Sequence, residues 1–596
     1  MLKKFFLNAL SSFLGAWIAL VLFGVVSVIV VLGLIGKLAS SSDNNQNIKK
    51  GSVLVVNLEG EIIENELPLD IDYIGLIQGE ISKKKALSEI TKAIEAAAEN
   101  KNVSGIYLKC GVCDASPATY NAIRNSLLKF KESGKPIIAY GNIIQMGCYY
   151  VATVADKIYL NPAGSVTLQG LGGINMFFKN LLDKIGIDVQ VVKVGTYKSA
   201  VEPFISSTMS QPARAQLDTL YGNMWKLIRE GISQQREDVT PGEIDTWVSE
   251  DFIFLKEAPF AMNKGLIDGI YYERSMDSII ASTIHKDKDD LNFISTESLI
   301  PVQQMELSYS QPEQIVVLYA SGEIVDGGAA STINYQALVP VITDLAENKK
   351  VKGMVLRVNS PGGSAFGSEQ IGEALDFFMS KGKPLAVSMG DYAASGGYWI
   401  SSGANIIFAD PLTITGSIGI FGLIPNAEKL MDKIGVNSEI VSTNPEAEFP
   451  NLLKPLNPRQ LAAMQETVSA GYDKFVARVA KGRHLSEATV RRIGEGRVWD
   501  AVTAKKIGLV DSLGGLQDAI DWVAKEIGND NYSVSYYPRK DNSMWSFLPE
   551  SFYTQLKENM RMTFGESLPE RFYYKIYNLI NQNPVQAKMP ELKIIL

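Results

Sequence analysis

The feature that most constrains the fold of this chain is a long internal repeat. Residues 135–141 (KPIIAYG) match residues 383–389 (KPLAVSM), and two further pairs of short matches follow in the same order. These pairs are Asp183–Gly186 with Asp432–Gly435, and Gly265–Asp268 with Gly508–Asp511. Within each copy, short apolar strands alternate with helical segments, a pattern typical of α/β units. The sequence therefore predicts two tandem α/β repeats.

The repeat divides the chain of 596 residues into four segments, since one hydrophobic core does not extend over this length. We expect a membrane anchor with its linker, a first α/β repeat, a second α/β repeat and an aromatic-rich tail. Their bounds are residues 1–50, 51–311, 312–530 and 531–596. The strands expected in the two repeats include Val189–Val194 and Glu439–Val441. No role for the tail follows from its sequence.

The N-terminal segment has the pattern of a membrane anchor. Lys3 and Lys4 precede a long uncharged run, and its most apolar part is Trp17–Ile35. This part has about the 20 residues that a spanning helix needs. A cleavage site typical of a secretory signal peptide does not follow it. The two lysines favour a cytoplasmic N-terminus, although further lysines after the run reduce the charge asymmetry.

Composition excludes the commonest ways to activate a serine or bind zinc. The chain has only 2 histidines, His285 and His484, and both are flanked by charged residues. A Ser-His-Asp triad and a histidine-rich zinc site are therefore not expected. The formal net charge of -8 gives no indication of a nucleic-acid partner.

Two of the 3 cysteines, Cys110 and Cys113, form a C-x-x-C motif that is compatible with redox activity or metal binding. A zinc site needs further ligands nearby, so we prefer an incidental pair of buried thiols. A disulfide between these two residues is the alternative in an oxidising compartment.

A serine flanked by glycines stands at a strand-to-helix turn in the second repeat. The apolar residues 385–389 are followed by a turn, and Ser395 then comes directly before Gly396 and Gly397. A serine at the first turn of a helix is well placed to be a nucleophile, and the free N–H groups there bind anions. The same pattern is also typical of a serine that only caps its helix.

The two copies of the repeat carry complementary polar residues. The aligned pairs are Ser395 with Gly147, Ser417 with Leu168, and Ala447 with Lys198. The glycine turn at residues 359–363 also has no counterpart in the first copy. The second copy thus carries two hydroxyls and a glycine turn, and the first carries a lysine. This distribution favours one composite site over two separate sites.

The chemistry of such a site requires a base, because a serine hydroxyl is a weak nucleophile until its proton is removed. With histidine excluded, Lys198 is the natural base, and its apolar neighbours would depress its pKa. Ser417 can hold the lysine amine, and the N–H groups of Gly363 and Gly396 would flank a carbonyl oxygen. Taken singly, each residue also fits a surface lysine, a turn hydroxyl or a tight turn.

These residues resemble the long, two-repeat form of the signal peptide peptidase A (protease IV) family of membrane-anchored serine proteases. The resemblance covers nearly the whole chain. Its motifs are residues 359–363 (NSPGG), 391–398 (DYAASGGY), 415–419 (TGSIG) and 195–200 (GTYKSA). It implies that Ser395 is the nucleophile, that Lys198 is the general base and that Ser417 positions the lysine. The fold it implies is a crotonase/Clp-protease-like α/β spiral in each half.

The same resemblance implies the substrates, assembly and location. The substrates would be remnant signal peptides and other unfolded or membrane-associated peptides, with no cofactor or metal. The protein would be a homo-oligomer, a tetramer for the two-repeat form. It would lie in the bacterial inner membrane, with its bulk on the periplasmic or extracytoplasmic side. The cysteine pair and the tail are not explained by the family pattern.

Two other functions remain open on the sequence. One is a crotonase-like acyl-CoA enzyme, against which the membrane anchor argues because acyl-CoA is cytosolic. The other is a non-catalytic membrane scaffold on the same fold, against which the intact Ser395 and Lys198 argue.

Overall fold

The computed structural model describes residues 48–65, 84–299, 315–327, 332–444, 446–529, 532–538 and 585–589. The anchor predicted at Trp17–Ile35 lies outside these residues. Within the described ranges, no helix is both long enough and apolar enough to cross a membrane.

The first repeat is built on a seven-stranded sheet in the order β2-β1-β3-β4-β5-β7, with β8 paired to β1. The strands are β1 (Ser52–Ile63), β2 (Lys85–Ala86), β3 (Val103–Asp114), β4 (Ile137–Gln145), β5 (Lys157–Thr167), β7 (Gly269–Ile270) and β8 (Asn292–Ile294). All of these pairings are parallel. The connecting helices pack one apolar face on the sheet. In α3 (Leu87–Glu99), for example, the buried residues Leu87, Ile90 and Ile94 are spaced so that they share one face of the helix.

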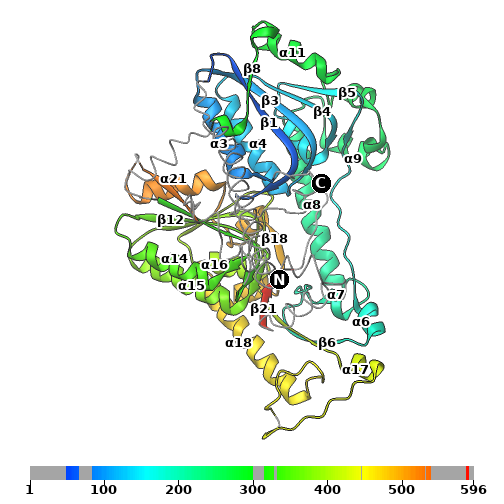
Figure 1. Ribbon diagram of the computed structural model, residues 1–596, viewed down its shortest axis with the longest axis vertical. Coiled ribbons are helices and arrows are strands. Elements are labelled where there is room, and N and C mark those ends of the chain that lie inside the picture. The colour runs from blue at the N-terminus through cyan, green and yellow to red at the C-terminus, as the bar shows by residue number, and fades with distance from the viewer. Residues whose placement is uncertain are drawn as a thin grey trace, which may run out of the picture.

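The second repeat has an eight-stranded sheet in the order β18-β16-β14-β12-β9-β20, with β15 paired to β14 and β19. Its strands are β9 (Ile315–Ser321), β12 (Gly353–Ser360), β14 (Leu385–Ala394), β15 (Ile406–Ala409), β16 (Ile414–Gly416), β18 (Val498–Asp500), β19 (Ser512–Leu513) and β20 (Val534–Tyr537). In Figure 1 the seven-stranded sheet of the first repeat lies above the sheet of the second, while the cyan segment of the first repeat with β6 and α6 extends down beside the second repeat.

Helices complete both repeats. In the first they are α3 (Leu87–Glu99), α4 (Pro117–Lys131), α5 (Met146–Ala152), α6 (Lys179–Ile185), α7 (Glu202–Ile205), α8 (Gln211–Ser233), α9 (Pro241–Ser249), α10 (Ala258–Asn263), α11 (Met276–Thr283) and α12 (Thr296–Leu299). In the second they are α14 (Tyr335–Glu347), α15 (Ala365–Ser380), α16 (Gly396–Ser401), α17 (Glu428–Ile434), α18 (Pro458–Gly482), α19 (Glu487–Ile493), α20 (Ala501–Lys506) and α21 (Leu516–Glu526).

The repeat in the sequence is also a repeat of contacts. Ile106 of β3 pairs with Ile137 of β4, and the aligned Met354 pairs with Leu385. The hydroxyl of Tyr149 donates to the carbonyl of Leu266 at 2.8 Å, and that of the aligned Tyr398 donates to Leu509, also at 2.8 Å. The prediction of two tandem α/β repeats is therefore confirmed.

A third sheet joins the two repeats. Its order is β11-β10-β13-β21-β17-β6. Its strands are β6 (Asp188–Val194), β10 (Ile324–Val325), β11 (Ile333–Asn334), β13 (Gly362–Ser364), β17 (Ile420–Asn426) and β21 (Val585–Lys588). Only β6 comes from the first repeat, and it runs antiparallel beside β17 of the second, as Figure 1 shows. The strands β20 and β21 lie in the segment 531–596, and both pair with strands of the second repeat.

The strand predicted at Glu439–Val441 does not form, and Val441 is 99% exposed. The corresponding segment of the first repeat is β6, which pairs with β17. The partner expected for residues 439–441 by the same alignment is 171–177, which corresponds to β17 but forms no continuous strand. Residues 439–441 therefore lack the neighbour that β6 has, and the prediction is wrong at this point.

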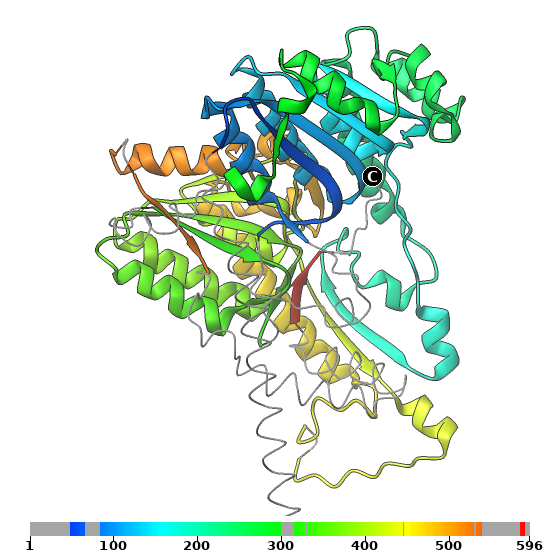
Figure 2. The same cartoon turned by 45° about the horizontal axis from the view of Figure 1, so that its top comes forward.

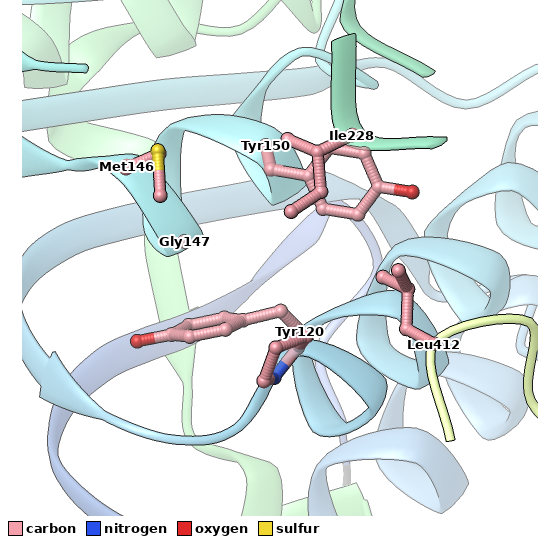
Figure 3. A pocket seen from close by; sticks show the side chains of 7 residues that line it. Tyr120, Met146, Gly147, Tyr150, Ile228 and Leu412 are labelled. Carbon is pink, nitrogen blue, oxygen red and sulfur yellow. The ribbon is translucent and has the colours of Figure 1, made fainter. Parts of the chain in front are cut away.

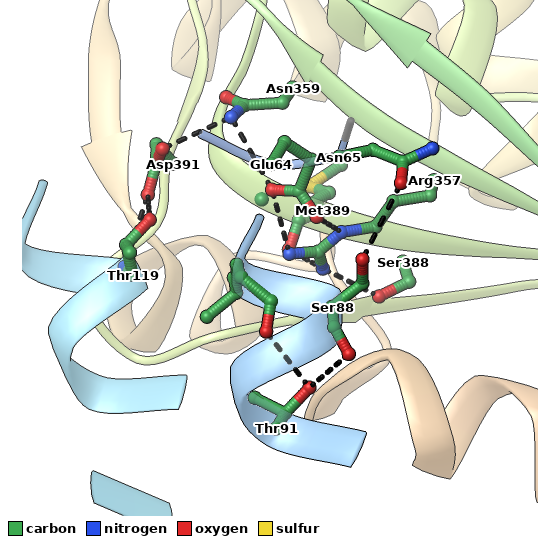
Figure 4. Close-up of polar contacts among 12 residues, drawn as sticks. Glu64, Asn65, Ser88, Thr91, Thr119, Arg357, Asn359, Ser388, Met389 and Asp391 are labelled. Atoms are coloured by element: carbon green, nitrogen blue, oxygen red, sulfur yellow. Dashed lines mark hydrogen bonds and ion pairs between the residues drawn. The ribbon is translucent and has the colours of Figure 1, made fainter. Parts of the chain in front are cut away.

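A buried ion pair crosses from one repeat to the other. Arg357 of β12 donates to Glu64, which follows β1, with Nε–Oε1 at 2.7 Å and Nη2–Oε2 at 3.1 Å. The same guanidinium donates to Ser388 Oγ and to the carbonyl of Met389, both at 2.9 Å (Figure 4). The side chains of Arg357 and Glu64 are only 8% and 7% exposed. Because water cannot solvate them, the charge of each is compensated by the opposite charge of the other.

We predict that Glu64→Ala lowers the free energy of unfolding by about 3–5 kcal/mol, because it leaves the buried charge of Arg357 unpaired. Denaturation in urea measures the change. The matched control is Glu61→Ala, three positions earlier, whose ion pair with Lys84 at 3.3 Å joins side chains that are 49% and 43% exposed. The control should lose at most about 1 kcal/mol, and equal losses would contradict the prediction.

Candidate active site

The pairing of β6 with β17 carries a lysine of the first repeat to two serines of the second. Val194 lies opposite Ile420 in this antiparallel ladder. Lys198 follows Val194 by one short turn, and Ser417 precedes Ile420 by a similar distance along the chain. Residues beyond one end of a strand stay close to residues before the start of its antiparallel partner. The ladder thereby brings the predicted lysine and the predicted second serine to the same place.

The three predicted polar residues meet in the interior of the protein. Lys198 Nζ lies 2.7 Å from Ser395 Oγ, 3.1 Å from Ser417 Oγ and 3.2 Å from the carbonyl oxygen of Ser417. All three residues are 0% exposed. The composite site inferred from the alignment of the repeats is therefore a single cluster in space.

Burial sets the electrostatics of this cluster. It holds the pKa of Lys198 well below the ordinary value of 10.5, because removal from water disfavours the charged ammonium. A neutral amine keeps a lone pair, which can accept the proton of a serine hydroxyl at 2.7 Å.

The backbone of Ser395 is held in a sparsely populated conformation. Its φ is 54° and its ψ is -115°, a combination that costs on the order of 1–3 kcal/mol. Its N–H donates to the carbonyl of Gly416 at 2.8 Å, and its own carbonyl accepts from the N–H of Trp399 at 2.8 Å. The Trp399 ring in turn stacks on Phe475 with centroids 4.5 Å apart. These contacts fix the turn that presents the hydroxyl to Lys198.

The glycine turn passes directly beside the first turn of α16. Gly362 and Gly363 have φ values of 100° and 149°, which side chains rarely allow. A Cβ built on Gly362 would lie 2.7 Å from the backbone nitrogen of Gly396. The structure thus places Gly363 and Gly396, the two predicted oxyanion donors, in adjacent parts of the backbone.

Polar side chains tie the two loops together and to the first repeat. Asn359 Nδ2 donates to Asp391 Oδ2 at 3.0 Å, and the N–H of Tyr392 donates to Asn359 Oδ1 at 3.1 Å. Asp391 also accepts from the hydroxyl of Thr119 on α4 at 2.8 Å, as Figure 4 shows. The glycine turn and the serine turn are therefore positioned relative to each other by side chains as well as by the sheet.

A loop that the sequence analysis missed completes the site. The backbone around Gly496 accepts hydrogen bonds from both sides of the cluster: Tyr197 N–H donates to Glu495 O at 2.9 Å, and Ser417 N–H donates to Arg497 O at 2.7 Å. A Cβ on Gly496, whose φ is 76°, would lie 2.7 Å from Lys198 Cβ. The Gly494-Glu495-Gly496 pattern was the only sequence signal for this loop.

The equivalent position of the first repeat is occupied by an aromatic ring. A Cβ on Gly147, which aligns with Ser395, would lie 2.3 Å from the ring of Tyr120. Figure 3 shows this ring in a small pocket that Met146, Tyr150 and Leu412 also line. The position equivalent to Ser395 therefore has neither a nucleophilic side chain nor room for one.

The three cysteines are buried free thiols. Cys148 lies next to Gly147, and its Sγ is 3.6 Å from the carbonyl oxygen of Gly111. In the part of the chain that the structure describes, no group of three or more His, Cys, Asp or Glu side chains can hold a metal ion.

Comparisons with known proteins find relatives that span both repeats. The family model described as "Peptidase family S49" matches residues 129–281 and 378–529. The chain is 32% identical over 575 residues to "Protease 4" of Haemophilus influenzae, with 93% of each chain covered. It is 28% identical over 496 residues to "Serine protease SPPA, chloroplastic" of Arabidopsis thaliana, with 81% of this chain and 70% of that protein covered. Among solved structures, a ClpP1 mutant from Listeria monocytogenes aligns with 37% of this chain and 99% of its own, at 13% identity and a TM-score of 0.24.

We predict that Gly496→Ala destabilises the protein more than Gly435→Ala does. Both glycines have a φ of 76°, so both variants pay roughly 1–2 kcal/mol for a left-handed alanine. A Cβ at Gly435 meets nothing within 4 Å, whereas one at Gly496 overlaps Lys198. The overlap should cost about 1–3 kcal/mol more. Urea denaturation of the two variants measures the difference in the free energy of unfolding. Equal losses in the two variants would contradict the prediction, because they would show that Lys198 can move aside at no cost.

Proposed function

Because the chain belongs to peptidase family S49 and is a serine protease, we propose that Ser395 is its nucleophile and Lys198 its general base. The observation that carries the proposal is the distance of 2.7 Å between Ser395 Oγ and the amine of a lysine with no exposed surface. Since the chain is a serine protease, the acyl-CoA enzyme and the non-catalytic scaffold no longer stand as alternatives.

In the proposed reaction, the proton of the Ser395 hydroxyl moves to Lys198 Nζ while Oγ attacks the carbonyl carbon of the scissile peptide bond. The N–H groups of Gly363 and Gly396 stabilise the negative charge that forms on the carbonyl oxygen. When the C–N bond breaks, the Lys198 ammonium returns its proton to the leaving amine. An ester of Ser395 remains, with the newly formed N-terminal fragment of the substrate as its acyl group.

Hydrolysis of the acyl-enzyme repeats these steps with water in place of the serine. Lys198 takes a proton from the water molecule as its oxygen attacks the ester carbonyl. When the bond from this carbon to Ser395 Oγ breaks, the Lys198 ammonium returns the proton to Oγ, and the N-terminal fragment leaves with a free carboxyl group. Ser417 takes part by holding the amine, since both its Oγ and its carbonyl oxygen lie within 3.2 Å of Lys198 Nζ. It is a positioning residue, because it does not touch the reacting carbonyl.

We further propose that the substrates are remnant signal peptides and other unfolded or membrane-associated peptides, cleaved at the extracytoplasmic face of a bacterial inner membrane. The supporting feature is the apolar run at Trp17–Ile35 with lysines before it, which would anchor the chain with its N-terminus in the cytoplasm. In this arrangement, segment 1–50 is the anchor, and the repeats 51–311 and 312–530 carry the lysine and the serine.

We also propose that the protein is a homo-oligomer, and specifically a tetramer. Its support is an exposed apolar surface on the arm that carries α6 and α17. Large apolar side chains on this arm are strongly exposed, namely Ile174, Met176, Leu181, Ile434 and Val436 at 81%, 66%, 51%, 60% and 46%. Figure 2 shows α6 and α17 at the outer end of the arm, away from both large sheets. Exposed apolar patches of this kind mark contacts with other protein chains.

We predict that Ser395→Ala and Lys198→Ala each lower kcat/KM for a fluorogenic peptide by at least about 10²–10⁴. Ser417→Ala, which removes one hydrogen bond to the amine, should lower kcat by about tenfold. The matched controls are Ser401→Ala, a buried serine of α16 that bonds Gly397, and Lys193→Ala on β6. If Lys198→Ala retains the activity of the parent while folded, Lys198 is not the base.

The pH dependence follows from the lowered pKa of Lys198. Only the neutral amine accepts the serine proton, so kcat/KM should rise with pH through a pKa well below 10.5. Lys198→Arg should be inactive at every pH, because a guanidinium does not deprotonate. A parent profile without a rising limb in this range would contradict the assignment.

The same shift predicts the pH dependence of stability. The unfolded chain has the ordinary lysine pKa of 10.5, so between the two pKa values it binds a proton that the folded chain does not. Stability should therefore be lost as pH falls from 10.5 to the folded pKa. Urea denaturation of the parent and of Lys198→Met over this range isolates the effect, since only the parent should show it.

A further inference from the structure

A short segment near the C-terminus is inserted in the third sheet at the active site. The strand β21 pairs antiparallel with β13 on one side and with β17 on the other (Figure 2, red strand). Among the strands that the structure describes, β13 and β17 are joined only through β21. β13 includes the last two residues of the glycine turn, and β17 begins three residues after Ser417. A slot between two strand edges of this kind binds an extended peptide by its main chain.

The register of β21 brings one carbonyl to the glycine donors. The N–H of Met589 donates to the carbonyl of Pro361 at 2.7 Å. Hydrogen-bonded pairs alternate along an antiparallel ladder, so Gly363 and Ala587, which lie opposite each other two positions on, form the next such pair. In that pair the Gly363 N–H faces the Ala587 carbonyl.

The same carbonyl lies beside the first turn of α16. A Cβ on Gly396 would lie 3.1 Å from the carbonyl oxygen of Ala587, and one on Gly362 would lie 2.2 Å from it. The Ala587 carbonyl can occupy this position because neither glycine has a side chain that would collide with it. It stands next to both proposed oxyanion donors, as the carbonyl of a scissile bond would.

The side chains of the segment are bound as well as its main chain. Ala587 is 0% exposed and packs in the core of the second repeat, while Met589 is 2% exposed and packs in the core of the first. The side chain of Lys588 is partly exposed to solvent, and its Nζ forms an ion pair with Glu323 Oε2 at 2.9 Å. The space around Ala587 is closed, so the groove in this form accepts a small side chain before the scissile bond.

We propose that residues 585–589 are a built-in occupant of the substrate groove, bound in the register of a substrate with Ala587 before the scissile position, and that external peptides must displace them. The proposal rests on the proposed function in one respect, namely that the groove beside Ser395 is where substrates bind. It adds the way in which the main chain is recognised and the preference for a small residue at the Ala587 position.

Displacement is tested first by binding, without catalysis. The probe is a fluorescein-labelled Val-Gln-Ala-Lys-Met peptide, with Val-Gln-Trp-Lys-Met as its control. In the full chain with Ser395→Ala, the probe competes with the tethered segment, whose effective concentration is about millimolar. Addition of Ala587→Trp should expel the segment and tighten probe binding at least tenfold. Lys588→Ala, a neighbouring change at a partly exposed side chain, should leave binding within about twofold of the Ser395→Ala parent.

A second variant guards against misfolding of Ala587→Trp. A chain that ends at residue 584, again with Ser395→Ala, should bind the probe as tightly as Ala587→Trp does. Equal binding of the probe by the parent, by Ala587→Trp and by the shortened chain would overturn the proposal. Equal binding of the alanine and tryptophan peptides would overturn the assigned register.

Kinetics give a separate readout with Ser395 intact. Ala587→Trp should lower KM for a fluorogenic peptide several-fold at unchanged kcat, since only competition for the groove is removed. An unchanged KM would overturn the proposal. If no variant has activity, the proposed function fails, whereas the binding comparison still decides whether the segment occupies the groove.

Discussion

The architecture depends on one contact, that of a buried lysine amine with a serine hydroxyl from the other repeat. Lys198 has no exposed surface, and burial holds its pKa well below the ordinary value of 10.5. Such a lysine is stable only where the surrounding residues supply polar partners, and here the hydroxyls of Ser395 and Ser417 and the carbonyl of Ser417 supply them. The pairing of β6 with β17 makes the contact possible, because it is the pairing that brings a strand of the first repeat into a sheet of the second.

The duplication of one α/β unit has led to a division of tasks. Both copies keep the same strand register and the same buried tyrosine hydroxyl bonds, so the frame is shared. Only the second copy keeps the glycine turn and the strained serine. In the first copy, Gly147 and the ring of Tyr120 fill the corresponding position. The buried pair of Arg357 and Glu64 then fixes one copy against the other. This frame holds the lysine of one copy against the serine of the other with the precision that the proposed proton transfer needs.

The glycines of the site share one physical role, which is to let backbones approach closely. Gly496 brings its loop against Lys198, and Gly362 with Gly396 leaves room for a peptide carbonyl. The segment 585–589 uses this room in the same way that a substrate would. Its Ala587 is enclosed by the core of the second repeat and its Met589 by that of the first, so the groove lies across the junction of the two repeats.

The sequence by itself determined the tandem α/β repeats and the identity of the three polar residues. Local alternation specifies strands and helices, and the alignment of two copies exposes the positions at which Ser395, Ser417 and Lys198 differ. The tertiary structure decided what depends on contacts between distant segments. These are the pairing of β6 with β17, the loop at Gly496 and the insertion of β21. The failed strand at Glu439–Val441 has the same origin, since its local pattern suits a strand but residues 171–177, which align with β17, form no continuous strand to pair with it. A strand is completed by its neighbour, and the neighbour is chosen by the fold and not by local periodicity.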